Sequence, residues 1–371
     1  MPRHYLDHAS TSPIRPAAVE AMLPWLRGDF PGDPGRVHTE GRMARVAIEE
    51  GREQVAALLG ARPREVVFTS GATEAINAAV WGSAERNPGQ AMVYADVEHS
   101  AVRDASSRHR TRVLPVDSTG RIDVAALDEL DPADVALVHC QWGNHEVGTL
   151  QPLEQVLAWC RAHGVLSHVD AAQAAGRVPI AFGGLGADLL TVSGHKFGGP
   201  PGIGALLVRR GLRLDPLVVG GEQERARRAG FENVPAIVGF GAAAAAVDVL
   251  QECERSLALS ERLLESLERI DGVHSYSPSD RSQRLPHIAC FGVDGVEAEP
   301  VLLGLDQAGI AAHSGSACSS ESLEPSPVLA AMGVDADHSL RISVGWNTTD
   351  EDVDAVIEAL PRVVDQLRSL R

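Results

Sequence analysis

The segment Thr191-Val-Ser-Gly-His-Lys-Phe-Gly-Gly-Pro-Pro-Gly-Ile-Gly204 leads an apolar strand into a polar loop rich in glycine. It contains Lys196, the single lysine of the chain; the other 32 of its 33 basic residues are arginines. A guanidinium stays protonated in proteins, whereas an amine can lose its proton and attack a carbonyl. Because ligands collect where strands of α/β sheets end, we expect Lys196 to be functional, with Ser193 and His195 beside it to bind an anion.

Apolar segments of strand length alternate with amphipathic segments before and after this loop. The expected strands cover 66–69, 92–94, 113–116, 135–140, 165–169, 189–192 and 205–208, and helices are expected over 42–59, 72–84 and 152–163. Such alternation is typical of a mostly parallel sheet with helices on both faces. The sequence therefore predicts an α/β fold whose large domain holds a seven-stranded sheet.

The pattern changes after a long helical stretch that we expect over 233–269. Strands near 273–277, 288–292 and 340–344 then alternate with helices near 297–308, 325–332 and 350–368. This pattern predicts a smaller C-terminal α/β domain. We therefore expect an N-terminal segment, 1–15, that packs with the small domain, a large domain over 16–250, and a small domain over 251–371 that carries Cys318.

Composition excludes several classes of function. The chain has 371 residues, 44% of them hydrophobic, and a formal net charge of -17. This acidic balance argues against binding to nucleic acid or to an anionic membrane surface. No apolar run approaches the ~20 residues of a membrane span, and the N-terminus does not resemble a signal peptide. Five cysteines without CxxC spacing favour a reducing, cytoplasmic location over a disulfide framework or a metal site.

A second loop, Phe68-Thr-Ser-Gly-Ala-Thr-Glu-Ala75, leaves a strand and begins a helix. Ala72 and Thr73 would present backbone N–H groups and a hydroxyl at the helix N-terminus, which suits a phosphate group. An ordinary N-cap is the alternative interpretation.

A third segment, Ser167-His-Val-Asp-Ala-Ala-Gln173, places Asp170 at the end of an apolar strand. Its carboxylate suits a cationic ring nitrogen, and Gln173 can hydrogen-bond an oxygen nearby, although an N-cap aspartate fits equally well. His99 also follows a strand and, taken alone, is more often a structural histidine. Together, the lysine, the phosphate loop and the aspartate predict pyridoxal phosphate, with Lys196 forming the Schiff base and Asp170 keeping the pyridine nitrogen protonated.

Five motifs, spread over the length of the chain, together resemble those of a known enzyme family. They are Tyr5-Leu-Asp-His-Ala-Ser-Thr-Ser-Pro13, Thr69-Ser-Gly-Ala-Thr-Glu74, His168-Val-Asp-Ala-Ala-Gln173, Ser193-Gly-His-Lys196 and Ser314-Gly-Ser-Ala-Cys-Ser-Ser320. In this order they resemble the cysteine desulfurases of bacterial iron–sulfur-cluster and nitrogenase assembly, in the class V aminotransferase superfamily. The resemblance covers essentially the whole chain and implies the fold of type I PLP-dependent transferases.

The resemblance implies a role for each site residue. Lys196 carries the cofactor and moves the Cα proton, His99 stacks on the pyridine ring, and Arg341 binds the substrate carboxylate. The remaining cofactor contacts are implied for Asp170, Gln173, Ala72, Thr73, Ser193, His195 and His145. L-Cysteine would be converted to L-alanine, with its sulfur held on Cys318 as a persulfide and passed to an acceptor protein or thiol. A homodimer is also implied, because phosphate sites in this superfamily draw on both subunits.

Three positions depart from the family pattern. His145 stands where an asparagine is usual, and we expect it to contact cofactor and substrate. Phe231 replaces a threonine that normally reaches the partner's phosphate, and Asp33 lies in an altered Gly32-Asp-Pro-Gly-Arg-Val-His38 segment. These departures favour a sulfur donor for one specialised pathway over a general one.

Two alternative functions stay open at the level of sequence. One is another reaction of the superfamily, such as transamination or a cysteine/selenocysteine lyase. Because transamination needs no thiol, Cys318 in its small polar surroundings argues against it. The other is a non-catalytic scaffold that binds a sulfur carrier.

Overall fold

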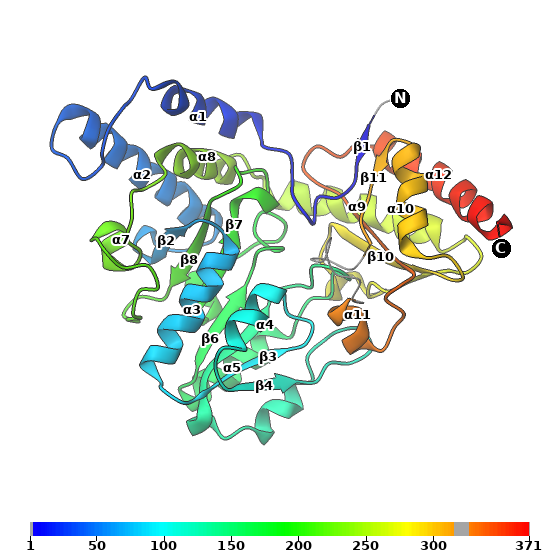
Figure 1. Cartoon of the computed structure of the whole chain (residues 1–371), viewed down its shortest axis with the longest axis horizontal. Helices are drawn as coiled ribbons and strands as arrows, with labels where there is room; N and C mark the ends of the chain where they lie inside the picture. Colours follow the sequence, from blue (N-terminus) through cyan, green and yellow to red (C-terminus); the bar gives the residue numbers. More distant parts are fainter. Residues whose placement is uncertain (1–2, 315–325, 371) are drawn as a thin grey trace.

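The computed structural model describes residues 3–314 and 326–370, and its centre is a seven-stranded sheet (Figure 1). The strand order is β2-β8-β7-β6-β5-β3-β4, in which β8 alone is antiparallel to its neighbours. The strands are β2 (Val66–Thr69), β3 (Ala91–Ala95), β4 (Thr111–Leu114), β5 (Val135–Gln141), β6 (Leu166–Asp170), β7 (Leu189–Ser193) and β8 (Gly204–Val208). This confirms the predicted α/β class with its mostly parallel sheet.

Helices cover the large sheet, and a second group of elements lies beside it (Figure 1). The large-sheet helices are α1 (Pro16–Arg27), α2 (Thr39–Leu58), α3 (Ala72–Arg86), α4 (Ser100–Ser106), α5 (Leu153–His163), α6 (Phe182–Leu185), α7 (Gln223–Ala226) and α8 (Val234–Ala245). The second group contains β9 (Val273–Ser275), β10 (Ile288–Val293), β12 (Ser339–Ser343), α9 (Val249–Leu267), α10 (Ala298–Gln307), α11 (Pro327–Met332) and α12 (Asp350–Ser369). Its sheet is antiparallel, in the order β12-β10-β9.

The central strands are buried on both faces, whereas the edge strand β4 is not. Every residue of β3, β5 and β7 is buried, but two of the four residues of β4 are exposed. The sequence places this strand at 113–116, and the structure places it at Thr111–Leu114. Pro115 follows at once, and a proline has no N–H to continue the ladder, so the strand ends there.

The helical stretch expected over 233–269 is two helices rather than one. Helices α8 and α9 are bent by 75° at a short break. Asp248 accepts a hydrogen bond from the backbone N–H of Gln251 and so caps a new helix start, which a continuous helix would not contain. Among the described residues no single helix qualifies as a membrane span, although this bent pair meets the length and composition test.

Two large hydrophobic clusters divide the chain. The first packs on one face of the seven-stranded sheet, whose other face carries a smaller cluster with α3 and α4, and the second joins Leu6 to apolar residues between Leu259 and Val364. The N-terminal strand β1 (His4–Tyr5) pairs in parallel with β11 (Ile310–Ala311) on the second cluster's side. Helix α11, however, packs its Val328 into the first cluster. The domain boundary near residue 250 stays a prediction, and α11 packs into the cluster of the large sheet although it follows that boundary in the chain.

Candidate active site

The loops that follow β2, β3, β5, β6 and β7 enclose a cavity of about 400 Å³. Its lining residues are Ser70, Gly71, Ala72, Thr73, Glu74, Ile76, His99, Ala101, Gln141, Gly143, His145, Asp170, Ala172, Gln173, Ser193, His195, Lys196, Pro201 and Gly202. The chain passes from β3 to β4 on one side and returns to β5 on the other, and such a reversal opens a crevice at the strand ends. Nine of the predicted site residues therefore meet in one place. Arg341 lies beside them, and Cys318 lies outside the described residues.

Lys196 ends the short 3₁₀ turn Gly194–Lys196 after β7, so the strand fixes its position. Its Nζ donates hydrogen bonds to the backbone oxygens of Ala9, at 2.6 Å, and Ser10, at 3.0 Å. The N-terminal segment therefore reaches into the cavity and holds the amine. No sequence pattern links residues so far apart in the chain.

The loop at Lys196 and the start of α3 lie against each other because Gly204 has no side chain. A Cβ atom there would stand 2.8 Å from the Cα of Gly71 and 2.6 Å from the backbone oxygen of Val192. Any larger residue would force these backbones apart. Gly204 thus brings the first turn of α3 next to Ser193 in the cavity wall.

The first turn of α3 lacks a side-chain cap, since Gly71 precedes it. The backbone N–H groups of Ala72 and Thr73 therefore donate no hydrogen bond to an N-cap side chain, because glycine has none. The one carboxylate of this turn, on Glu74, accepts from the N–H of Ser70 and forms an ion pair with Arg228 at 2.9 Å. Because that negative charge is compensated, the helix start suits an anion, with Ser193 and His195 on the adjacent loop.

Asp170, the last residue of β6, also lines the cavity, and it is only 8% exposed. Burial raises the pKa of its carboxyl to about 6, against the lowering effect of a hydrogen bond from the Ala172 N–H and of the nearby Lys196 charge. A cationic partner would relieve this cost, since an opposite charge favours the ionised carboxylate. Gln173 is fixed from both sides, because its Nε2 donates to the backbone oxygen of Ala9 at 2.8 Å and its Oε1 lies 3.2 Å from His287 Nε2.

His99 and His145 form an edge-to-face pair at the cavity, with ring centroids 5.2 Å apart. The pKa of each imidazole is lowered to about 3, mainly because the rings are buried. The positive charge of Lys196 lowers both pKa values further. His99 also caps α4, because its Nδ1 accepts a hydrogen bond from the backbone N–H of Ala101 at 3.1 Å. That acceptor role requires neutral imidazole with its proton on Nε2.

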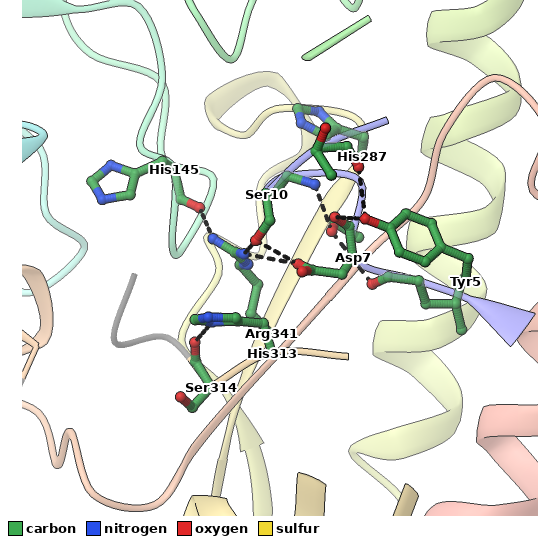
Figure 2. Close-up of polar contacts among 12 residues, drawn as sticks. Tyr5, Asp7, Ser10, His145, His287, His313, Ser314 and Arg341 are labelled. Carbon is green, nitrogen blue, oxygen red and sulfur yellow. Dashed lines mark hydrogen bonds and ion pairs between the residues drawn. The ribbon is translucent and has the colours of Figure 1, made fainter. Parts of the chain in front are cut away.

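Arg341, whose polar contacts Figure 2 shows, stands on β12, and it is only 2% exposed. Its Nη1 donates to the backbone oxygen of His145 at 2.8 Å, and its Nη2 donates to Asp7 Oδ1 at 2.9 Å and to Ser10 Oγ at 2.7 Å. Its Nε has no hydrogen-bond partner among the described residues. The guanidinium is therefore oriented by fixed contacts and retains a spare donor.

Sequence reasoning missed several residues of this site. Glu98 is completely buried, and burial together with the negative charge of Asp170 raises the pKa of its carboxyl to about 8. It precedes His99, yet nothing in the local sequence indicates that it is buried. Asp7, Ser10 and His287 come from segments far from the cavity loops in the sequence. Asp7 and Ser10 belong to a motif that carries the family resemblance, whereas His287 belongs to none.

Comparison with known proteins agrees with this geometry. The aminotransferase class-V family model matches residues 4–356. An IscS-like cysteine desulfurase of Mycobacterium tuberculosis is 44% identical over 384 residues, which cover 98% of this chain and 97% of the relative. The solved structure of a NifS-like protein superposes with a TM-score of 0.90 at 31% identity, covering 98% of this chain and 100% of that one.

A further solved structure, SspA in complex with cysteine, is 29% identical with a TM-score of 0.81, covering 92% of this chain and 98% of that one. Sequence and structure thus agree along nearly the whole chain. The protein belongs to the class-V aminotransferase family and, within it, to the cysteine desulfurases.

Proposed function

We propose that this chain uses pyridoxal phosphate to convert L-cysteine to L-alanine, and that Cys318 receives the sulfur. One observation carries the proposal: the only lysine of the chain shares a cavity with an uncapped helix start and with a buried aspartate. An amine, an anion site and a carboxylate are the three partners that the aldehyde, phosphate and ring nitrogen of the cofactor need.

The described residues fit the cofactor. The first turn of α3, with Ala72 and Thr73, together with Ser193 and His195, would hold its phosphate. Asp170 would hold the protonated ring nitrogen and His99 would lie against the ring, while Gln173 and His145 would contact its edge. Bound pyridoxal phosphate supplies an aldehyde that captures the substrate amine and a ring that accepts the electron pair of the Cα–H bond.

The chain's own residues then bind the substrate and move its protons. Arg341 binds the carboxylate of L-cysteine through the N–H groups that its contacts with His145, Asp7 and Ser10 leave available, and a hydrogen bond between two charged groups is a strong one. Lys196 removes the Cα proton as its neutral amine, and the neutral imidazole of His99, with its proton on Nε2, assists proton transfer through its hydrogen bonds in the same cavity. The Cys318 thiolate attacks the substrate sulfur, and the carbon–sulfur bond breaks to leave a persulfide on Cys318 and L-alanine after reprotonation.

The other cysteines are poor sulfur acceptors. Cys140, Cys160 and Cys290 are buried, and burial raises the pKa of Cys160 and of Cys290 to about 12. Neither these nor Cys253 line the cavity. A thiol must ionise to act as a nucleophile, so Cys318 is left as the candidate.

The described residues His313 and Ser326, on either side of the segment with Cys318, contact residues of the site. His313 exchanges backbone hydrogen bonds with Arg341, and Ser326 donates a hydrogen bond to Glu146, the neighbour of His145. These contacts support access of Cys318 to the substrate bound at Arg341.

The direct test is to supply pyridoxal phosphate, L-cysteine and a reducing thiol, and to quantify alanine from the intact protein, Cys318→Ala and Lys196→Ala. We expect alanine from the intact protein alone, and a cofactor absorbance of Schiff-base type that Lys196→Ala loses. Alanine that persists in Cys318→Ala would instead indicate a lyase. No alanine from the intact protein, with no absorbance, would indicate a binding scaffold.

We also infer that two copies of the chain associate. A shallow hollow beside Trp25 and Phe30 is bordered by Asp33 and by Phe231, whose side chain is 66% exposed. Further exposed apolar residues, Leu26 and Val46 among them, lie on neighbouring α1 and α2, and such patches mark protein interfaces. Sedimentation should give a dimer for the intact protein and more monomer for Phe231→Glu; a monomeric intact protein would refute the inference.

We further propose that the sulfur goes to one dedicated pathway. The altered positions Asp33, His145 and Phe231 support a donor dedicated to one acceptor protein or thiol, rather than a general supplier for iron–sulfur clusters. Expression in a strain that lacks its general desulfurase should give little rescue. Full rescue would contradict the specialised role.

A further inference from the structure

The N-terminal segment Asp7–Ser10 contacts both the cofactor side and the substrate side of the site. The backbone oxygens of Ala9 and Ser10 accept from Lys196 Nζ, and the side chains of Asp7 and Ser10 accept from Arg341 Nη2 (Figure 2). Four consecutive residues thus connect the amine to the guanidinium. Under the proposed function Arg341 binds the substrate, whereas Asp7 and Ser10 have no assigned role.

The segment is itself held firmly in place. Asp7 forms a parallel bridge with Ser343 of β12, and the N–H of Ala9 donates to Ser343 Oγ at 2.9 Å. The hydroxyl of Tyr5 donates to the backbone oxygens of Asp7 and Thr11. Asp7 therefore has a fixed position relative to Arg341, which stands on the same strand as Ser343.

The contacts of Asp7 and Ser10 close a small ring of hydrogen bonds. Ser10 Oγ donates to Asp7 Oδ1 at 2.9 Å, and both oxygens accept from the same Nη2 of Arg341. The Asp7 side chain is 17% exposed and that of Arg341 only 2%, so solvent screens this ion pair weakly. Nη1 is fixed separately by the backbone oxygen of His145.

A second buried arginine, Arg52, is held by a different set of contacts. Arg52 is also 2% exposed, and its Nη1 and Nη2 each donate to a different carboxylate oxygen of Glu224. Its Nε donates to Glu49, so no nitrogen of this guanidinium lacks a partner. In Arg341, by contrast, Asp7 binds through one oxygen on one nitrogen, and Nε lacks a partner among the described residues.

We propose that Asp7, assisted by Ser10, is a positioning residue that holds Arg341 by its Nη2 so that its remaining N–H groups face the carboxylate of an amino-acid substrate. The proposal rests on the proposed function of Arg341. A guanidinium that is oriented before binding loses less conformational entropy when the substrate arrives. Asp7 therefore acts on carboxylate binding and not on the chemical step.

The experiment compares the cofactor-loaded intact protein with Asp7→Asn and Ser10→Ala. Binding is measured by the change in cofactor absorbance with L-alanine, which has the carboxylate, and with L-alaninamide, which lacks it. Asp7→Asn should weaken L-alanine binding roughly ten- to a hundredfold, the loss typical of a hydrogen bond to a charged group, and Ser10→Ala several-fold. Binding of L-alaninamide should stay within about twofold, and KM for L-cysteine should rise much more than kcat falls.

A double-mutant cycle tests whether Asp7 acts through Arg341. In an Arg341→Ala background, Asp7→Asn should weaken L-alanine binding no further, because the group that it positions is gone. Asp306→Asn is the matched control, since it removes the exposed ion pair between Asp306 and Arg3, outside the segment Asp7–Ser10, and should leave every constant unchanged. Cofactor content and thermal unfolding verify that each variant is folded and loaded.

The outcomes separate the two proposals. If the intact protein binds L-alanine and forms alanine, but Asp7→Asn binds L-alanine as tightly or more tightly, the positioning role is wrong and the proposed function stands. An equal loss for L-alaninamide, or an additive loss in the Arg341→Ala background, also overturns it. If the intact protein neither binds L-alanine nor forms alanine, both proposals fail together.

Discussion

Two pairs of histidines in this molecule have nearly the same geometry but different surroundings. The rings of His99 and His145 meet edge to face at 5.2 Å beside the cavity, and those of His139 and His168 do so at 4.9 Å inside the sheet. Burial lowers the pKa of both members of each pair. A displaced pKa by itself therefore does not distinguish a catalytic histidine from a structural one.

The hydrogen bonds and the access to the cavity do distinguish them. His168 connects His139 Nδ1, at 2.9 Å, to Thr191 Oγ1, at 2.8 Å, so the core pair links neighbouring strands, and neither histidine lines the cavity that contains Lys196. His99 and His145 both line the cavity that contains Lys196. We therefore expect changes at the cavity pair to affect activity and changes at the core pair to affect stability.

The largest effect should come from His99→Gln. The loss of an imidazole that assists proton transfer typically lowers the rate about 10²- to 10⁴-fold, and we expect this loss in kcat for alanine formation. The midpoint of thermal unfolding should move little, since glutamine retains an acceptor for the cap of α4. A kcat within threefold of the intact protein would show that His99 is structural, like the core pair.

The next effect in size concerns the core pair. His168→Ala removes the hydrogen bonds to His139 and Thr191 and leaves a cavity between strands, so the free energy of unfolding should fall by about 2–4 kcal/mol. Denaturant titration measures this loss, and kcat of the folded fraction should be retained. Loss of activity without loss of stability would contradict the assignment of the pair to the core.

The pH dependence of stability sharpens the same contrast. A buried neutral histidine with a lowered pKa resists protonation in the folded state, so the unfolded chain binds more protons below about pH 6.5. The free energy of unfolding should therefore fall as the pH drops below about 6.5, and it should go on falling until the pH reaches the folded-state pKa of His168, about 3. Each such histidine contributes a loss of up to about 1.4 kcal/mol per pH unit.

Asp170 and Glu98 have the opposite effect on the free energy of unfolding, because their pKa values are raised in the folded state. The folded chain therefore binds more protons at these carboxyls than the unfolded chain, which stabilises it as the pH falls. The core histidines can be isolated by comparing unfolding free energies at pH 7 and pH 5. His168→Gln should lose less stability over this interval than the intact protein. An equal loss would mean that the core pair does not contribute.

The smallest effect is expected for His145→Asn. The contact of this residue with Arg341 uses its backbone oxygen, which asparagine retains, and its ring shares the cavity wall with His99. KM for L-cysteine and kcat should each change less than tenfold. A larger loss would show that the imidazole of His145, and not only its backbone, takes part in binding or proton transfer.

The secondary structure and the main loops of the site could be predicted from local patterns. Each strand from β2 to β8 was placed within about two residues, because fully buried strands are continuous apolar runs bounded by polar loops. Asp170 ends such a strand and Lys196 and Thr73 follow others, and the carboxyl ends of parallel strands meet at one edge of a sheet. The break between α8 and α9 was missed, because the residues on both sides favour helix and only Asp248 marks the new start.

The sequence by itself determined the α/β fold, the alternation of strands and helices, and the set of side chains suited to pyridoxal phosphate, because these follow from short-range periodicity and from residue chemistry. Only the tertiary structure decided which distant groups complete the site: Asp7 lies 334 residues from Arg341, and Gln173 lies 114 residues from His287. It also decided which histidines stand beside the cavity and which lie in the core. Burial and long-range contacts are properties of the packed chain, and no local stretch of sequence contains them.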